Sequence, residues 1–160
     1  IFESELMTLG LTISPHDAGL MIRGLRTLEL RVKRSDETAQ KVADFLYQHP
    51  KIEKLYFPLH PSFDQYALAS KQMTGCGGLI TIKLKAASKE STMRFVRSIK
   101  RFLMAVSWGG YESLMIPSIA FHDIPGMPDS PIHWSMVRLY IGLESAEYLI
   151  EDLSHALDAM

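Results

Sequence analysis

One long stretch with helical periodicity constrains the fold of this chain more than any other feature. It begins at Ser14-Pro15, where the serine can cap exposed backbone N–H groups and the proline suits the first helical turn. Apolar residues then recur at helical spacing to about His49, with one break predicted at Gly24. Pro50 ends the pattern, because proline has no N–H to donate and restrains the residue before it.

The rest of the chain alternates between strand-like and helical patterns. Strands are predicted at 52–57, 79–84, 103–108 and 136–143, and helices at 63–73, 88–102 and 146–157, with a proline-rich loop over 117–131. The glycines of 75–78 lack the spacing of a phosphate-binding loop and are interpreted as a helix stop before a strand. We therefore expect a two-layer α+β fold, with about four strands covered by helices in a single domain over 1–160.

Composition excludes several classes of protein. A net charge of −1 gives no basic excess for binding nucleic acid. The single cysteine, Cys76, excludes an internal disulfide and is compatible with a reducing cytosol, and the six histidines show no metal-ligand spacing. No apolar run reaches the ~20 residues of a membrane helix, and no signal peptide is visible. Because the first residue is Ile1 and not methionine, we expect a processed or excised piece of a longer protein.

The segment from Ser107 to Ser113 is a first candidate site. Its sequence is SWGGYES, and it follows a predicted strand. Paired glycines allow backbone to approach a ligand closely, while the serine and the tryptophan offer a hydroxyl, an N–H and a flat apolar face. A turn in which the glycines serve geometry alone would look the same in the sequence.

Arg138 is a second candidate. Alternation along its strand places it on the same face as Met136 and Tyr140, with Val137 and Leu139 on the other face. A guanidinium there either faces water or forms a bidentate clamp for a substrate carboxylate, which its planar fork suits. Spacing leaves both interpretations open.

Several motifs together resemble the trans-sulfuration (Cys/Met metabolism) family of enzymes that depend on pyridoxal phosphate (PLP). SWGGYESL at 107–114 is similar to the family's S-[LW]-G-G-x-E-S-L, and RLYIGLE at 138–144 is similar to I-R-L-[SH]-[VI]-G-[IL]-E from its arginine onward. The helix with Asp17-Ala18 and RGLRTL at 23–28 also fits, as do the glycines before the strand at 79–84. These matches cover nearly the whole chain, in the family's order.

This resemblance implies a role for each candidate. Arg138 would bind the α-carboxylate of an amino-acid thioether, assisted by Ser107 and the backbone around Trp108, with Val106 and Tyr111 affecting specificity. The chain would be the small carboxy-terminal, substrate-binding domain of a fold-type I PLP enzyme. None of its nine lysines matches the Schiff-base motif. The resemblance therefore implies that catalytic and cofactor-binding residues belong to a missing amino-terminal domain, that the chain alone is inactive, and that the parent is a cytoplasmic homotetramer.

The tryptophan–tyrosine form of the motif resembles the bacterial cystathionine beta-lyase branch. That branch carries out α,β-elimination of L-cystathionine to homocysteine, pyruvate and ammonia. Val106 agrees with this, because members acting at the γ-carbon often carry glutamate at that position. Two alternatives stay open: a γ-type enzyme (cystathionine gamma-lyase or synthase, or methionine gamma-lyase), and a non-catalytic interaction module that has kept the fold.

Overall fold

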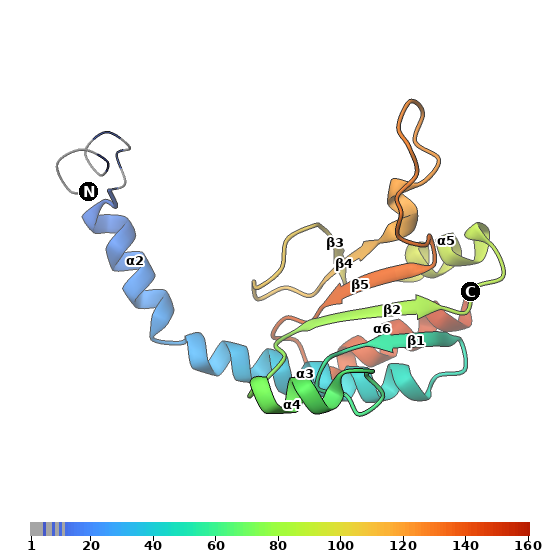
Figure 1. Cartoon of the computed structure of the whole chain (residues 1–160), viewed down its shortest axis with the longest axis horizontal. Coiled ribbons are helices and arrows are strands. Elements are labelled where there is room, and N and C mark those ends of the chain that lie inside the picture. Colours follow the sequence, from blue (N-terminus) through green and yellow to red (C-terminus); the bar gives the residue numbers. More distant parts are fainter. Residues whose placement is uncertain (1–4, 6–7, 9, 11) are drawn as a thin grey trace. The chain divides into compact units, whose positions relative to one another are not determined.

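The computed structural model describes residues 5, 8, 10 and 12–160. The chain divides into two compact units, Ile1–Arg31 and Val32–Met160. Figure 1 shows the elements in chain order. No helix in the described part of the chain is long and apolar enough to cross a membrane.

The first unit holds helix α2, Pro15–Leu25, and the start of α3, Leu28–Gln48. The predicted start of α2 is confirmed: the hydroxyl oxygen of Ser14 accepts a hydrogen bond from the backbone N–H of Asp17 at 3.1 Å. The predicted break lies just after Gly24, between α2 and α3. None of the residues of α2 is buried.

The second unit is built on a mixed sheet of five strands in the order β1-β2-β5-β4-β3. All neighbouring strands are antiparallel except β3 and β4, which are parallel. The strands are β1 Ile52–Tyr56, β2 Leu79–Leu84, β3 Leu103–Met104, β4 Leu114–Pro117 and β5 Met136–Tyr140. Between and after them lie α4 Tyr66–Gln72, α5 Lys89–Ser98, the short 3-10 helix η2 Ser118–Phe121 and α6 Ala146–Asp158.

Helices cover one face of this sheet (Figure 1). Alternate residues of β2 and β5 are buried there against α3, α5 and α6, as the period of two predicts. The fully buried residues include Val42, Leu46, Ile80, Ile82, Val137, Leu139, Leu149 and Leu153. The two-layer prediction is confirmed. The opposite face of the sheet is not covered by these helices, and the side chains of the candidate site lie on it.

The sheet differs from the prediction at its β3–β4 edge. The strand predicted over 103–108 is only the two residues of β3, and β4 was not predicted as a strand, so the sheet has five strands, which roughly fits the predicted number of about four. Both are short, and pairing with neighbours defines them: Leu103 and Met104 pair with Leu114 and Met115. The helix predicted over 88–102 ends at Ser98: the N–H of Ile99 still donates to the carbonyl of Phe95, and the carboxylate of Asp152 accepts from the N–H groups of Lys100 and Arg101 that follow.

Candidate functional site

Arg138 lies at the centre of the uncovered sheet face. In β5 it pairs with Thr81 of β2 on one side and with Ile116 of β4 on the other. Its guanidinium donates hydrogen bonds to the backbone carbonyl of Val106 and, at 3.3 Å, to that of Ser107. The structure therefore brings together Arg138 and the start of the SWGGYES segment, 31 residues away in sequence.

The Nε of Arg138 is buried and has no hydrogen-bond partner among the described residues. Guanidinium nitrogens have no acceptor capacity, so a buried, unpaired N–H needs an oxygen from elsewhere. A carboxylate is well suited, since its two oxygens match the geometry of the fork. The carboxylate-clamp role of Arg138 stays a prediction.

Arg138 also lines a hollow of about 470 Å³ on the same face. The other lining residues come from four strands, from η2 and from the loop that follows it: Tyr56, Thr81, Ile116, Ser118, Phe121, Ser130, Ile132 and Met136. Apart from Arg138, none of these side chains carries a charge. The surface thus combines a single positive charge with a largely apolar wall, a combination that is common in sites for small molecules.

The other predicted site residues lie in the loop between β3 and β4. The side chains of Val106, Trp108 and Tyr111 are exposed, at 67%, 60% and 75% of their full accessibility. Gly109 has a φ of +90°, a conformation that side chains disfavour, so this glycine has a geometric reason to be there. The loop's first half meets Arg138, and its aromatic side chains project outward.

The second half of this loop is fixed to the end of β5 by five hydrogen bonds. The Tyr140 hydroxyl donates to the Gly110 carbonyl at 3.0 Å, and the Leu143 N–H donates to the Tyr111 carbonyl at 2.8 Å. Ser113 makes the other three. Its N–H and its hydroxyl both donate to the carboxylate of Glu144, at 3.0 and 2.8 Å, and its hydroxyl accepts from the N–H of Gly142 at 2.9 Å.

Gly142 permits this close approach. A Cβ at this position would lie 2.2 Å from the carbonyl oxygen of Tyr111, so no larger residue fits without moving the loop. Sequence reasoning gave no role to Gly142, Ser113 or Glu144. Their presence in the two family motifs was the available signal, and the contact between the motifs explains why both contain them.

The segment Gly75–Gly78, which was predicted as a helix stop, also makes hydrogen bonds to helix α3. Asp36 of α3 accepts hydrogen bonds from the N–H groups of Cys76 and Gly77, at 2.7 and 2.9 Å. Gly77 has a φ of +62°, which the turn requires. Burial is the main reason that the pKa of the Cys76 thiol lies above its ordinary value, which favours the protonated thiol over the thiolate.

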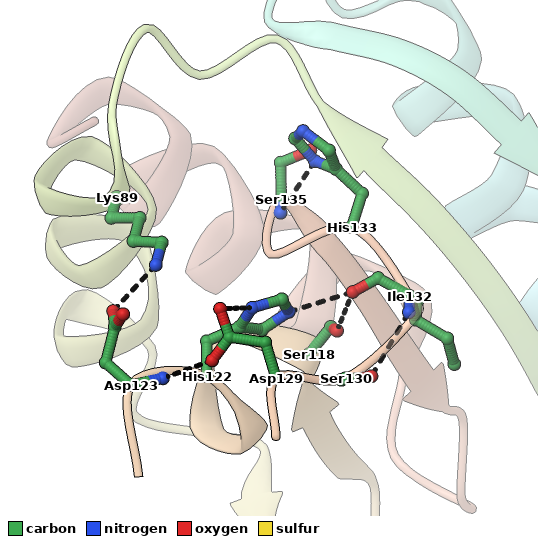
Figure 2. A network of polar contacts seen from close by, with 9 residues as sticks. All are labelled: Lys89, Ser118, His122, Asp123, Asp129, Ser130, Ile132, His133 and Ser135. Carbon is green, nitrogen blue, oxygen red and sulfur yellow. Dashed lines mark hydrogen bonds and ion pairs between the residues drawn. The ribbon is translucent and has the colours of Figure 1, made fainter. Parts of the chain in front are cut away.

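A polar network fixes the loop that forms one wall of the hollow (Figure 2). The ring of His122, 7% exposed, lies with Nε2 at 2.9 Å from the carbonyl oxygen of Ile132 and Nδ1 at 3.5 Å from the carboxylate of Asp129. Because a carbonyl can only accept, Nε2 carries a proton. Asp129 also accepts from the N–H of Asp123 at 2.8 Å, and that hydrogen bond is the main reason that the pKa of Asp129 lies below its ordinary value.

Lys89 completes the network from α5. Its ammonium lies 2.7 Å from the carboxylate of Asp123, and that contact raises the pKa of Lys89 above its ordinary value. The hydroxyl of Ser118 donates to the same Ile132 carbonyl at 2.9 Å. Sequence reasoning missed this wall, because it treated 117–131 as an undivided proline-rich loop.

Comparison with known proteins assigns the family. The sequence profile described as "Cys/Met metabolism PLP-dependent enzyme" matches residues 3–158. The chain belongs to this family.

Individual relatives agree with that assignment. The chain is 40% identical to cystathionine gamma-lyase of Sus scrofa over 156 residues, which are 95% of this chain and 38% of the relative. It is 41% identical to L-methionine gamma-lyase of Pseudomonas deceptionensis over 155 residues, 94% of this chain and 39% of the relative. A solved structure of O-acetylhomoserine sulfhydrylase from Wolinella succinogenes is similar with a TM-score of 0.82 and 32% identity, covering 97% of this chain and 42% of that one.

These comparisons revise the predicted branch. The relatives from Sus scrofa and Pseudomonas deceptionensis are gamma-lyases, so they support the γ-type alternative and not the beta-lyase interpretation drawn from the tryptophan–tyrosine motif. The chain spans about two fifths of the length of these relatives.

The residues that line the hollow do not fit PLP itself. None of the residues that line the hollow is a lysine. Lys54, Lys83 and Lys89 are each paired with a carboxylate, and Lys51 donates to the carbonyl of Leu157 at 2.6 Å at the end of α6. Among the residues that the structure describes, no three acidic, histidine or cysteine side chains gather in a way that could hold a metal ion.

Proposed function

We propose that this chain is the substrate-binding part of a PLP-dependent carbon–sulfur lyase, and that Arg138 binds the α-carboxylate of an amino-acid thioether. This proposal rests on the environment of the Arg138 guanidinium. Two backbone carbonyls orient it, its buried Nε has no partner in the described part of the chain, and it brings the positive charge to the lining of the hollow. Family membership supports the reaction class.

The cofactor and its lysine would come from a cofactor domain outside residues 1–160, and the enzyme would work as a cytoplasmic homotetramer. PLP supplies the electron sink for such eliminations. What Arg138 contributes is orientation: a carboxylate held at two nitrogens fixes the Cα of the substrate relative to the cofactor. On this proposal the 160-residue chain alone has no lyase activity. Turnover of L-cystathionine by the purified chain with added PLP would disprove that part.

Arg138→Ala in the complete enzyme tests the role of the guanidinium. Loss of a charged, bidentate contact should lower kcat/KM by about two orders of magnitude. Arg97→Ala is a matched control, because it removes the same charge from an exposed position of α5 that does not line the hollow. An Arg138→Ala enzyme with near-normal kcat/KM would rule out the carboxylate role.

We favour γ-elimination, because the relatives from Sus scrofa and Pseudomonas deceptionensis are gamma-lyases. β-Elimination is the second candidate, and Val106 supports it. Val106 comes directly before Ser107 and is exposed. Because its side chain is apolar, it offers no carboxylate to the distal ammonium group of a substrate.

Product analysis separates the two candidates. The complete enzyme is given L-cystathionine, and the keto acid and the amino acid are identified. Cysteine with 2-oxobutyrate supports γ-elimination, whereas homocysteine with pyruvate supports β-elimination. In the second case, Val106→Glu should raise the fraction of γ-product.

A further inference from the structure

The backbone carbonyls that orient Arg138 belong to the loop between β3 and β4, and contacts of other residues hold this loop in place. Val106 and Ser107 offer their backbone carbonyls to the guanidinium, yet their own side chains are exposed, so the packing of those side chains does not fix the backbone. Further along the loop, Ser113 is fully buried. The carbonyls of Val106 and Ser107 are therefore held from the two ends of the loop: Ala105 N–H donates to the Met115 carbonyl at 3.2 Å at one end, and Ser113 is anchored at the other.

Glu144 provides that anchor. Its two carboxylate oxygens accept separately from the N–H and the hydroxyl of Ser113, at 3.0 and 2.8 Å. The same hydroxyl accepts from Gly142 N–H at 2.9 Å, so Ser113 is held from both sides by the segment that follows β5. Hydrogen bonds to a carboxylate are about twice as strong as neutral ones, which suits an anchor at the end of a loop.

The anchor closes a ring of contacts through Arg138. The segment from Arg138 to Glu144 is continuous, and the loop from Val106 to Ser113 is joined to it at both of its ends, by the guanidinium and by the carboxylate of Glu144. We infer that Glu144 and Ser113 are positioning residues that hold the carbonyls of Val106 and Ser107 where they orient Arg138 for a substrate carboxylate. This inference rests on the proposed carboxylate role of Arg138 and adds the residues through which that role is set.

Two ligands that differ in a single group make the test specific. L-Norleucine has no sulfur leaving group and carries the α-carboxylate; n-pentylamine is the same molecule without that carboxylate. Competitive inhibition constants of both are measured on the complete enzyme with PLP, for the wild type, Glu144→Ala, Glu144→Gln and Glu147→Ala. Glu147 is an exposed acid in the first turn of α6, so its removal controls for the change in charge.

We expect Glu144→Ala to weaken binding of L-norleucine about tenfold, because residues that orient a binding group typically have effects of this size. The same substitution should change binding of n-pentylamine by less than about twofold. Glu144→Gln should restore most of the difference, because an amide can accept from the Ser113 N–H and donate to its hydroxyl. Glu147→Ala should behave as the wild type does.

The outcomes separate this inference from the proposed function. If the wild type binds L-norleucine no better than n-pentylamine, the carboxylate role of Arg138 fails and this inference fails with it. If the wild type discriminates and Glu144→Ala discriminates equally well, or loses affinity for both ligands alike, only the positioning role is overturned. Should Glu144→Ala fail to fold, Ser113→Ala removes the hydroxyl contacts, keeps the backbone N–H, and is expected to show the same selective loss.

Discussion

Gly78 and Ile141 touch through their backbones. The N–H of Ile141 donates to the carbonyl of Gly78 at 2.8 Å, and a Cβ at Gly78 would lie 2.3 Å from the carbonyl oxygen of Ile141. This contact joins the turn before β2 to the segment after β5 that anchors the substrate loop.

Gly78→Ala should therefore lower the free energy of unfolding. The new methyl group meets backbone atoms that cannot turn away, and overpacking of this kind costs about 1–3 kcal/mol. Urea unfolding followed by circular dichroism measures the change. Gly75→Ala is the matched control from the same turn: its Cβ would meet Asp36 at 3.5 Å, an ordinary contact, so its stability should stay within about 0.5 kcal/mol of the wild type. Equal stabilities for the two variants would contradict this account.

Asp36→Ala should also destabilise the second unit. The substitution leaves the N–H groups of Cys76 and Gly77 without their acceptor. Hydrogen bonds to a charged group contribute about 1.5–3 kcal/mol, and because Asp36 is half-buried we expect about 1.5 kcal/mol. Glu37→Ala, one residue further along α3 and exposed, should change stability by less than about 0.5 kcal/mol. The prediction fails if the two substitutions are equivalent in thermal unfolding.

His122→Ala should loosen the wall of the hollow. The substitution removes the contacts of the ring with the Ile132 carbonyl and with the carboxylate of Asp129. The segment 123–131 lies between the residues that these contacts join, so its backbone amides should exchange with deuterium faster in the variant. His133→Ala should leave the exchange rate of this segment unchanged, because His133 interacts with Ser135 and not with 122–130. Unchanged exchange in His122→Ala would show that the network does not hold the loop.

His49 makes stability depend on pH in a definite direction. Burial is the main cause of its pKa lying below the ordinary value; Lys51 adds to the effect and Asp158 opposes it. Because the folded pKa is the lower one, the unfolded chain binds more protons at mildly acidic pH, so this contribution to stability is present above the unfolded pKa and is lost as pH falls through the folded pKa.

The free energy of unfolding of the wild type should therefore fall, relative to His49→Gln, as the pH is lowered from about 7.5 to about 5 across the ordinary titration range of histidine. Denaturant unfolding at a series of pH values measures this difference. A difference that does not change with pH would contradict the assigned sign.

Local patterns in the sequence predicted the elements that such patterns specify. The helix start at Ser14-Pro15, the stop before Pro50 and the strand over 79–84 each follow from caps, breakers or alternation within a few residues. Alternation also placed Arg138 on the face away from Val137 and Leu139, which the burial of β5 confirms. Strands β3 and β4 could not be predicted in the same way, since two and four residues carry no periodicity of their own and pairing alone defines them.

For the candidate site, too, the sequence determined some features and the tertiary structure decided others. By itself, the sequence determined the residue types and the motifs, and through them the family: an arginine in a strand, a glycine-rich loop and their order along the chain. Tertiary structure decided that the carbonyls of Val106 and Ser107 meet Arg138 and that Glu144 meets Ser113, contacts that span 31 or 32 residues. The physical reason is that strand order sets such contacts: β4 lies beside β5 in the sheet, and no local spacing records which strands become neighbours.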